Sequence, residues 1–303
     1  MHNVMVVSRQ RDFYESLLLD ATLPNLNITA DPAQATIILA DPPLILPLID
    51  QFPRLHWLQS TFAGIDALIQ PNLRQDYLLT NIKGCFGQLI SEYVLGLLLE
   101  HTRHFPDYHR QQTQCQWHAH PYSSLVNKRM VILGTGSIGS HLARSARALG
   151  MHVTGVNRSG QSSATEFDQI FAITELPLAL SLADVVVSTL PATRDTDDLL
   201  NQQTLSHCRD SLLFNVGRGN AVCESGLLHA LAQGAIRHAF LDVFKQEPLP
   251  ANHPFWRHPS ITITPHIAAE SFPEQVMAIF TDNYLHWINN QPLRYTVDFS
   301  RGY

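Results

Sequence analysis

The 303-residue sequence has few of the features that mark membrane, secreted or nucleic-acid-binding proteins. Its longest apolar run, residues 93–99, is far shorter than the roughly 20 residues that a membrane-spanning helix needs. The N-terminus lacks the basic-then-apolar layout of a signal peptide, and no basic stripe suggests contact with nucleic acid. The four cysteines form no C-x-x-C pair, so we expect a reduced, cytoplasmic protein without membrane or nucleic-acid partners.

The sixteen histidines do not form a recognisable metal-binding pattern. His101 with His104 and His118 with His120 are the closest pairs, but neither has a third ligand at a suitable spacing. We therefore expect a surface helix and a solvated loop at these positions, and no metal site.

What the sequence does contain is a long alternation of strand and helix patterns, in a chain long enough for two α/β domains. Strands are expected at 4–7, 36–39, 55–58, 78–80, 128–133, 152–156, 184–190, 211–216, 239–243 and 261–264. Helices are expected at 12–19, 66–69, 91–104, 107–114, 138–149, 224–233 and 273–289. Ser91 is the expected N-cap of the helix at 91–104.

A glycine-rich turn after the strand at 128–133 predicts a dinucleotide site. Gly134, Gly136 and Gly139 form a G-x-G-x-x-G pattern between a strand and a helix, and another strand follows at once. Such glycines allow a tight turn and close backbone approach, and the helix N-terminus meets the pyrophosphate. This context favours a cofactor site over an ordinary glycine-rich turn.

The end of the next strand bears on the choice of cofactor. NAD sites usually have Asp or Glu there to bond the ribose 2′-hydroxyl, but this chain has Asn157, Arg158 and Ser159. Without the carboxylate a 2′-phosphate is not repelled, and an arginine fork with a hydroxyl can bind it. We therefore expect NADP(H) to be preferred. The alternative is an NAD(H) site beside which Arg158 is only a solvated loop residue.

Three polar residues, Arg218, Glu247 and His266, each follow an apolar strand in the last third of the chain. Because the carboxyl ends of parallel strands open onto the ligand crevice, we expect these side chains to converge there. A guanidinium binds a carboxylate bidentately, and an imidazole oriented by a carboxylate can transfer a proton. Each residue alone is as easily explained as a turn or loop residue. Together, beside a hydride-carrying cofactor, they indicate reduction of a 2-oxo acid.

Five motifs in order, at 134–139, 185–196, 215–219, 241–250 and 264–269, make the chain resemble the D-isomer-specific 2-hydroxyacid dehydrogenase family over nearly its whole length. The stretches 253–259 and 301–303 most resemble the glyoxylate/hydroxypyruvate reductase A branch. The resemblance implies an α/β fold, with a Rossmann-type doubly wound parallel-sheet cofactor domain (99–269) inserted into a discontinuous flavodoxin-like α/β substrate domain (1–98 plus 270–303). It also implies a homodimer, and an active site between the two domains.

The resemblance assigns a role to each of the three polar residues. Arg218 would hold the carboxylate and the oxo group of the substrate, His266 would protonate the carbonyl oxygen, and Glu247 would orient the imidazole and favour its protonated form. A glutamine in place of Glu247 would indicate the formate dehydrogenases of the family, so the glutamate argues against that reaction.

The resemblance also implies contacts outside these three residues. Backbone N–H groups around Phe62, Ala63 and Gly64 would bind the substrate carboxylate, unless this is a turn without a ligand. Trp117 would reach a pocket across a dimer interface, or else pack at an exposed edge. The implied cofactor contacts are Gly134, Gly136, Ser137, Ile138, Gly139, Asn157, Arg158, Ser159, Leu190, Pro191, Thr196, Val216, Gly217, Asp242 and Ala268. Asp242 would contact the nicotinamide amide, or instead cap a neighbouring turn.

The sequence therefore predicts an NAD(P)H-dependent reductase, preferring NADPH, that converts small 2-oxo acids such as glyoxylate or hydroxypyruvate to D-2-hydroxy acids. One alternative is an NAD-dependent D-2-hydroxyacid or phosphoglycerate-type dehydrogenase. Another, of a different class, is a dinucleotide-sensing interaction protein similar to the corepressors of the same family. The intact set of Arg218, Glu247 and His266 favours an enzyme.

Overall fold

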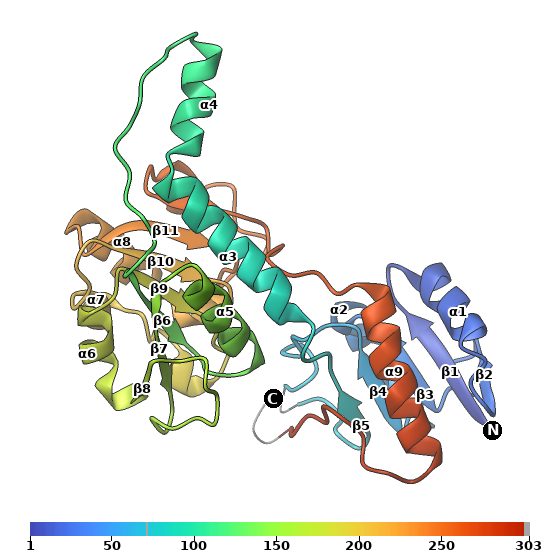
Figure 1. Ribbon diagram of the computed structural model, residues 1–303. Coiled ribbons are helices and arrows are strands. Elements are labelled where there is room, and N and C mark those ends of the chain that lie inside the picture. The colour runs from blue at the N-terminus through green and yellow to red at the C-terminus, as the bar shows by residue number, and fades with distance from the viewer. Residues whose placement is uncertain (71, 300–303) are drawn as a thin grey trace. The chain divides into compact units, whose positions relative to one another are not determined.

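The computed structural model describes residues 1–70 and 72–299, so the stretch at 301–303 lies outside the described residues. The chain forms two compact units, each with its own sheet (Figure 1). One is built from Met1–Cys85 together with Ser271–Tyr303, and the other from Phe86–Glu270. The first unit is thus discontinuous in sequence, because the chain leaves it to form the second unit and then returns.

The first unit is a five-stranded sheet with all its strand pairs parallel. Its strand order, β2-β1-β3-β4-β5, is the order of flavodoxin-like folds. The elements are β1 (His2–Val7), α1 (Arg11–Asp20), β2 (Leu26–Ile28), β3 (Ile37–Ala40), α2 (Pro42–Ile45), the 3-10 helix η1 (Leu46–Gln51), β4 (Trp57–Ser60), β5 (Leu78–Thr80) and α9 (Pro273–Ile288).

Helix α9 is fastened to this sheet by aromatic stacking and a buried polar network. The Trp57 ring stacks on Phe280 with 5.1 Å between centroids. The Gln59 Oε1 atom, which is fully buried, accepts hydrogen bonds from Thr80 Oγ1 at 2.7 Å and from Asn283 Nδ2 at 3.1 Å. Because buried polar atoms must be paired, these bonds fix the position of the C-terminal helix α9 on the sheet.

The second unit is a seven-stranded sheet, again all parallel, with the order β12-β11-β10-β9-β6-β7-β8. Its elements are α3 (Phe86–Thr102), α4 (Phe105–Thr113), β6 (Arg129–Leu133), α5 (Ser137–Ala148), β7 (His152–Asn157), β8 (Gln169–Ala172), η2 (Ile173–Glu175), α6 (Leu176–Ser181), β9 (Val185–Ser188), η3 (Arg194–Thr196), α7 (Gln202–Leu205), β10 (Ser211–Asn215), η4 (Gly219–Ala221), α8 (Glu224–Ala232), β11 (Ile236–Leu241), η5 (Pro254–Arg257) and β12 (Ile261–Ile263).

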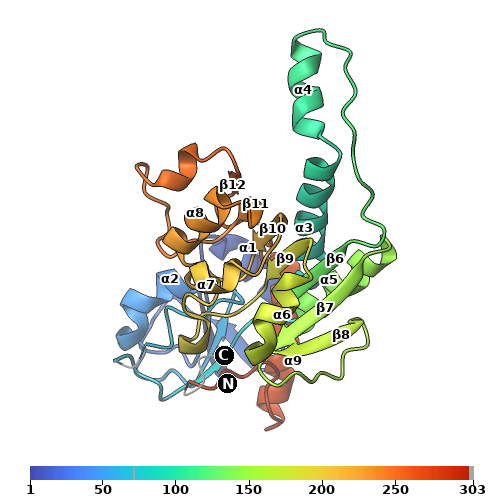
Figure 2. The same cartoon turned by 90° about the vertical axis from the view of Figure 1, so that its left-hand side faces the viewer.

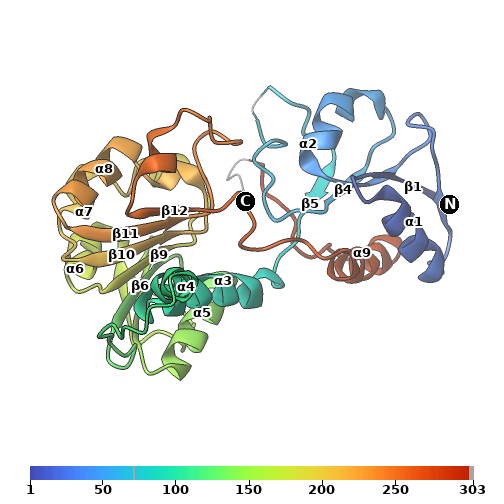
Figure 3. The same cartoon turned by 90° about the horizontal axis from the view of Figure 1, so that it is seen from above.

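This sheet is doubly wound. Helices α6, α7 and α8 cover one face, and α3 and α5 cover the other (Figure 3). Every residue of β9 and β10 is buried, as expected of central parallel strands covered on both sides. The chain starts at β6 in the middle of the sheet, builds outward through β7 and β8, and then reverses through β9 to β12. The reversal between β6 and β9 is the switch point at which such sheets bind ligands.

These observations confirm the expected fold class, a Rossmann-type unit and a flavodoxin-like unit. The boundary expected at residues 98/99 lies inside α3, whereas the chain passes from the first unit to the second between Cys85 and Phe86. The reason is that α3 buries Ile90, Val94 and Leu98 and packs along α5 of the second unit. The sequence of a helix that follows such a boundary does not indicate which of the two units will pack against its apolar face.

The expected N-cap of this helix was wrong. Helix α3 begins at Phe86, and Ser91 is a buried interior residue. The Ser91 hydroxyl donates to Gly87 O at 2.6 Å, so it accepts from His141 Nδ1, which lies 2.9 Å away on α5. Serine serves this role because its hydroxyl can bond back to the preceding turn while it links two helices.

The helix expected at 66–69 was also wrong, because this segment is a turn in which Leu68 N donates to Ile65 O at 2.8 Å. The sequence places Pro71 shortly afterwards, and the residue before a proline avoids helical angles, which stops the turn from extending. Short elements such as β2, β8, α2, α6 and α7 were not anticipated, since three to six residues are too few to show a period.

Helix α4 and the loop that leads from it to β6 project away from the rest of the second unit as an arm (Figure 2). None of the residues of α4 is buried, and Trp117 in the following loop is fully exposed. Among the described residues, no helix is both long and apolar enough to cross a membrane.

The contact between α3 and α5 can be tested at two glycines of α3. A Cβ added at Gly87 would lie 2.6 Å from the Cβ of His141, whereas a Cβ added at Gly96 would meet no described atom within 4 Å. We expect Gly87→Ala to lower the free energy of unfolding by about 1–3 kcal/mol through overpacking. Gly96→Ala, the matched control, should raise it by about 0.5–1 kcal/mol because alanine favours the helix. Urea denaturation measures both, and equal effects of the two changes would contradict the close packing.

Candidate active site and cofactor-binding loop

The turn between β6 and α5 is shaped by its glycines. Gly134 has a φ of +104°, and a Cβ there would lie 2.6 Å from Thr189 Oγ1. A Cβ at Gly139 would collide with the Gly134 carbonyl, so the helix can approach the turn only with glycine at this position. A Cβ at Gly136 would meet no described atom within 4 Å, so this side of the turn faces open space.

Helix α5 begins at this open side. Gly136 is its N-cap and provides no side-chain bond to the first turn. The first N–H groups of a helix have no partner within it, and together with the helix dipole they attract anions. The turn therefore has the space and the donors that a dinucleotide pyrophosphate requires.

Asn157, at the end of β7, organises the loop beside this turn. Its Nδ2 donates to Thr135 Oγ1 and to Gln161 O, both at 2.8 Å. Its Oδ1 accepts from Ser159 N at 3.0 Å and from Gly160 N at 2.8 Å. The side chain thus ties the loop after β7 to the glycine-rich turn. An aspartate could not donate to Thr135 Oγ1 or Gln161 O, so the amide has a structural reason as well as the electrostatic one expected from the sequence.

Arg158 points into solvent from the same loop. Its Nη2 lies 3.3 Å from Asp195 Oδ2 of η3, and these two side chains are 72% and 77% exposed. An exposed pair of this kind contributes little stability and exchanges partners readily. A phosphate could therefore replace Asp195 as the partner of this guanidinium at small cost.

The loops after β9 and β10 lie against each other at the carboxyl edge of the sheet. A Cβ added at Gly217 would lie 2.6 Å from Leu190 N, so these two loops approach backbone to backbone. Thr196 Oγ1 donates to Pro191 O at 2.8 Å and holds the first of them in a compact turn. The structure thereby brings the expected cofactor residues Leu190, Pro191, Thr196, Val216 and Gly217 to one edge of the sheet.

His266 and Glu247 form a direct pair. The His266 Nδ1 atom lies 2.7 Å from Glu247 Oε2, and the other carboxylate oxygen, Oε1, accepts from Phe244 N at 2.8 Å. The His266 side chain is 47% exposed, so the ring is held on one side and open on the other. His266 has a φ of +57°, a left-handed conformation that non-glycine residues adopt only where their surroundings hold them.

Arg218 lies between β10 and η4, beside this pair. Its Nη1 donates to Gly217 O at 2.8 Å. The next residue, Gly219, abuts the backbone of Phe244, and a Cβ there would collide with it. Because Phe244 also donates to Glu247, this contact brings Arg218 close enough to influence the pKa values of both Glu247 and His266.

The charges of the pair support each other. Burial pushes the pKa of Glu247 upward, but the hydrogen bonds from His266 and Phe244 N, together with the charges of His266 and Arg218, outweigh it, and the pKa falls below its ordinary value. The hydrogen bond to Glu247 raises the pKa of His266 above its ordinary value, against the opposing effects of burial and Arg218. The imidazole therefore keeps its second proton to a higher pH than an ordinary histidine.

Asp242, which follows β11, is 1% exposed and is bonded to the turn that carries His266. Its carboxylate accepts from Thr264 Oγ1 at 2.6 Å, from Ile267 N at 2.8 Å and from Ala268 N at 2.9 Å. Asp242 thus caps the neighbouring turn, which is the alternative role given above, and its contact with nicotinamide stays a prediction. The sequence did not single out Thr264 for a role of its own, although it stands in the motif that contains His266.

The loop after β4 belongs to the first unit. Phe62 N donates to Ser60 Oγ at 3.0 Å, and Asn81 Nδ2 donates to Ala63 O at 2.8 Å. One of the three N–H groups expected to bind the substrate carboxylate thus has a partner within the loop. The Phe62 ring is exposed, and Asn81 Oδ1 is buried without a hydrogen-bond partner.

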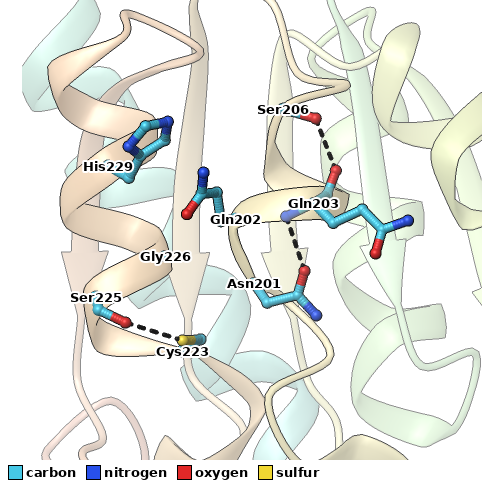
Figure 4. A pocket seen from close by; sticks show the side chains of 8 residues that line it. All are labelled: Asn201, Gln202, Gln203, Ser206, Cys223, Ser225, Gly226 and His229. Atoms are coloured by element: carbon cyan, nitrogen blue, oxygen red, sulfur yellow. Dashed lines mark hydrogen bonds between the residues drawn. The ribbon is translucent and has the colours of Figure 1, made fainter.

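Other candidate positions show no comparable chemistry. No group of three His, Cys, Asp or Glu residues within 1–70 and 72–299 is arranged to hold a metal ion. A hollow of about 560 Å³ between α7 and α8 is lined by polar side chains that include Asn201, Cys223 and His229 (Figure 4). Neither the glycine-rich turn nor the residues Arg218, Glu247 and His266 line it.

Comparison with known proteins identifies the family of the chain. The model of the D-isomer specific 2-hydroxyacid dehydrogenase NAD-binding domain matches residues 95–268, more than half of the chain. The chain belongs to the D-isomer specific 2-hydroxyacid dehydrogenase family. The family resemblance inferred from the five motifs is thereby confirmed, and the protein is an NAD(P)-dependent oxidoreductase with a nicotinamide cofactor.

Individual relatives of this dehydrogenase agree. Glyoxylate/hydroxypyruvate reductase A of Serratia proteamaculans is 38% identical over 261 residues, which cover 82% of each chain, and supports the expected branch. A family member from Aeromonas salmonicida subsp. salmonicida has a solved structure with a TM-score of 0.94 and 45% identity, covering 98% of this chain and 99% of that one. A member from Xanthobacter autotrophicus Py2, in complex with NADPH and MES, has a TM-score of 0.88 and 29% identity, covering 100% and 99%.

The coupling of the dehydrogenase's His266 and Glu247 predicts a pH effect. Because the hydrogen bond to Glu247 is the main cause of the raised pKa of His266, we expect Glu247→Gln to move this pKa downward. The native pair stabilises the fold below the unfolded pKa of histidine, and this contribution is lost as pH rises through the folded pKa. NMR titration of the His266 ring measures the shift. An unchanged His266 titration in the variant would contradict the coupling.

Proposed function

We propose that this protein is an NADPH-preferring reductase of small 2-oxo acids, of the glyoxylate or hydroxypyruvate type, that yields D-2-hydroxy acids. The observation that carries the proposal is the 2.7 Å bond between His266 and Glu247, with Arg218 beside it, at the carboxyl edge of the sheet that bears the glycine-rich turn. The name of the Serratia relative and the NADPH bound by the Xanthobacter protein support it.

In this proposal the bound nicotinamide supplies the hydride. Arg218 binds the substrate carboxylate through its planar fork and lies near the oxo group. His266 Nδ1 donates to Glu247, so the Nε2–H group on the open side of the ring is the proton donor to the carbonyl oxygen. The carbonyl carbon gains the hydride, its oxygen gains the proton, and His266 becomes neutral while it remains bonded to Glu247. The imidazolium and the guanidinium both stabilise the negative charge that develops on the oxygen.

The cofactor would lie over the carboxyl edge of the second unit. The glycine-rich turn and the first turn of α5 would hold the pyrophosphate, and the loops after β9, β10 and β11 would line the remainder. Arg158, with help from the Ser159 hydroxyl, would bind the 2′-phosphate of NADPH in exchange for Asp195. Asn157 would keep this loop in place through its bonds to Thr135 and Gln161.

The first unit would serve as the substrate domain, with the loop at 62–64 binding the substrate carboxylate through its backbone. We further propose a homodimer, in which the projecting arm with the exposed Trp117 contacts a second copy. The relatives described above give no support to the phosphoglycerate-type or corepressor-like alternatives.

A substrate and cofactor panel tests the reaction. We expect oxidation of NADPH with glyoxylate and with hydroxypyruvate, and slower oxidation of NADH. His266→Ala should lower kcat by roughly 10²- to 10⁴-fold, the usual contribution of general acid catalysis, with a smaller effect on KM. His152→Ala is a control, because His152 begins β7 and therefore lies at the amino edge of the same sheet, and it should leave kcat unchanged. Tight cofactor binding without turnover of any oxo acid would refute the enzyme assignment.

The preference for NADPH is tested at Arg158. Removing a charge-assisted bond to the 2′-phosphate costs about 1.5–3 kcal/mol, so Arg158→Ala should raise KM for NADPH by about 10- to 100-fold. KM for NADH should not change, because NADH has no phosphate there. Arg144→Ala, which removes an exposed arginine that pairs with Glu166 on the surface, is the matched control. A wild-type protein faster with NADH, or an equal loss with both cofactors, would refute this role.

A further inference from the structure

A chain of three polar side chains leads from α3 to the turn that carries His266. The Tyr93 hydroxyl of α3 lies 2.6 Å from Thr264 Oγ1, which follows β12. Thr264 Oγ1 in turn lies 2.6 Å from Asp242 Oδ1, at the end of β11. Two of these residues are separated by 171 positions in the sequence, so the contact exists only in the folded protein.

The number of protons fixes the direction of both bonds. The Asp242 carboxylate also accepts from Ile267 N and Ala268 N, and an ionised carboxylate can only accept. The single proton of the Thr264 hydroxyl therefore goes to Asp242, and Tyr93 donates to Thr264. Burial raises the pKa of Tyr93 to about 12, so the phenol keeps the proton that it donates.

This chain closes the turn around Asp242. His266 N donates to Asp242 O at 2.9 Å, and the Asp242 carboxylate accepts from Thr264 before His266 and from Ile267 and Ala268 after it. The left-handed φ of His266 costs free energy for a residue with a Cβ, and these bonds offset that cost.

The segment that begins at Asp242 also positions Glu247, the partner of His266. Within this segment, Phe244 N donates to Glu247 Oε1. A turn tied to Asp242 is therefore held at a fixed distance from the Glu247 carboxylate. A looser turn would let the imidazole move away from Glu247 without any change in either residue.

We propose that Tyr93 and Thr264 are positioning residues for His266, acting through Asp242 to keep the imidazole bonded to Glu247. Their kinetic effect rests on the proposed function, whereas their effect on the geometry does not. Within residues 1–70 and 72–299, the charged groups that act on His266 are Glu247, Arg218 and Asp242, of which the two carboxylates raise its pKa and Arg218 lowers it.

Four variants of the full chain test this. Thr264→Val removes both hydroxyl bonds at nearly constant volume, Thr264→Ser retains them, and Tyr93→Phe removes only the outer donor. Thr262→Val is the matched control, since its hydroxyl lies on β12 and contacts His238 Nε2 at 2.8 Å instead of Asp242. NMR titration of the His266 ring, assigned with the His266→Ala variant, is measured beside kcat and KM with NADPH and glyoxylate.

We expect Thr264→Val to move the His266 titration to lower pH, in the direction of Glu247→Gln, and to lower kcat by about tenfold or more, with KM within about twofold. Tyr93→Phe should give the same changes at smaller size, with kcat reduced about three- to tenfold. Thr264→Ser should leave the His266 titration close to that of the wild type and kcat within about threefold of it. Thr262→Val should change neither the titration nor kcat.

Two results would overturn the proposal. One is a His266 titration unchanged in Thr264→Val, whatever happens to kcat, since lost activity alone would indicate a general loosening. The other is an equal shift in Thr262→Val. If Thr264→Val does not fold, the Tyr93→Phe titration decides the question alone. If the wild-type protein reduces no oxo acid, the reductase proposal fails, but the titrations still decide whether Tyr93 and Thr264 position His266.

Discussion

Parallel pairing of seven strands is the constraint on which the rest of the second unit depends. Because every strand of such a sheet runs in the same direction, every loop that follows a strand lies at the same edge. The reversal of winding between β6 and β9 separates the loops there and leaves room for a ligand. The glycine-rich turn, Arg218, Glu247 and His266 come from distant parts of the sequence, yet each follows a strand of this one sheet.

Close backbone contacts at that edge then determine how the side chains meet. Gly217 lies against Leu190 and Gly219 lies against Phe244, and at either glycine a side chain would push neighbouring loops apart. Loop packing thus sets the place of Arg218, while hydrogen bonds to Asp242 set that of His266. The left-handed backbone of His266 persists because several bonds hold the turn, so a strained residue and a dense local network occur together, as at many functional sites.

The electrostatics follow from this geometry. The His266–Glu247 hydrogen bond contributes both to the lowered pKa of Glu247 and to the raised pKa of His266, so the imidazole keeps its second proton to a higher pH than an ordinary histidine. In the loop after β7, beside the glycine-rich turn, Arg158 pairs with Asp195, and both of these side chains are exposed. The structure thus combines a firmly bonded imidazole with an arginine whose partner is easily exchanged, as the proposed roles of proton donor and phosphate ligand require.

The sequence by itself determined the features that depend on local pattern. Apolar runs marked most strands, the glycine spacing marked the turn before α5, and the residue types at 218, 247 and 266 indicated the chemistry. Tertiary structure decided the rest, because it depends on contacts between distant segments. Packing against α5 placed α3 in the second unit and made Ser91 an interior residue. The fold also gave Asn157 its bonds to Thr135 and joined Tyr93 to Thr264, pairings that no local periodicity encodes.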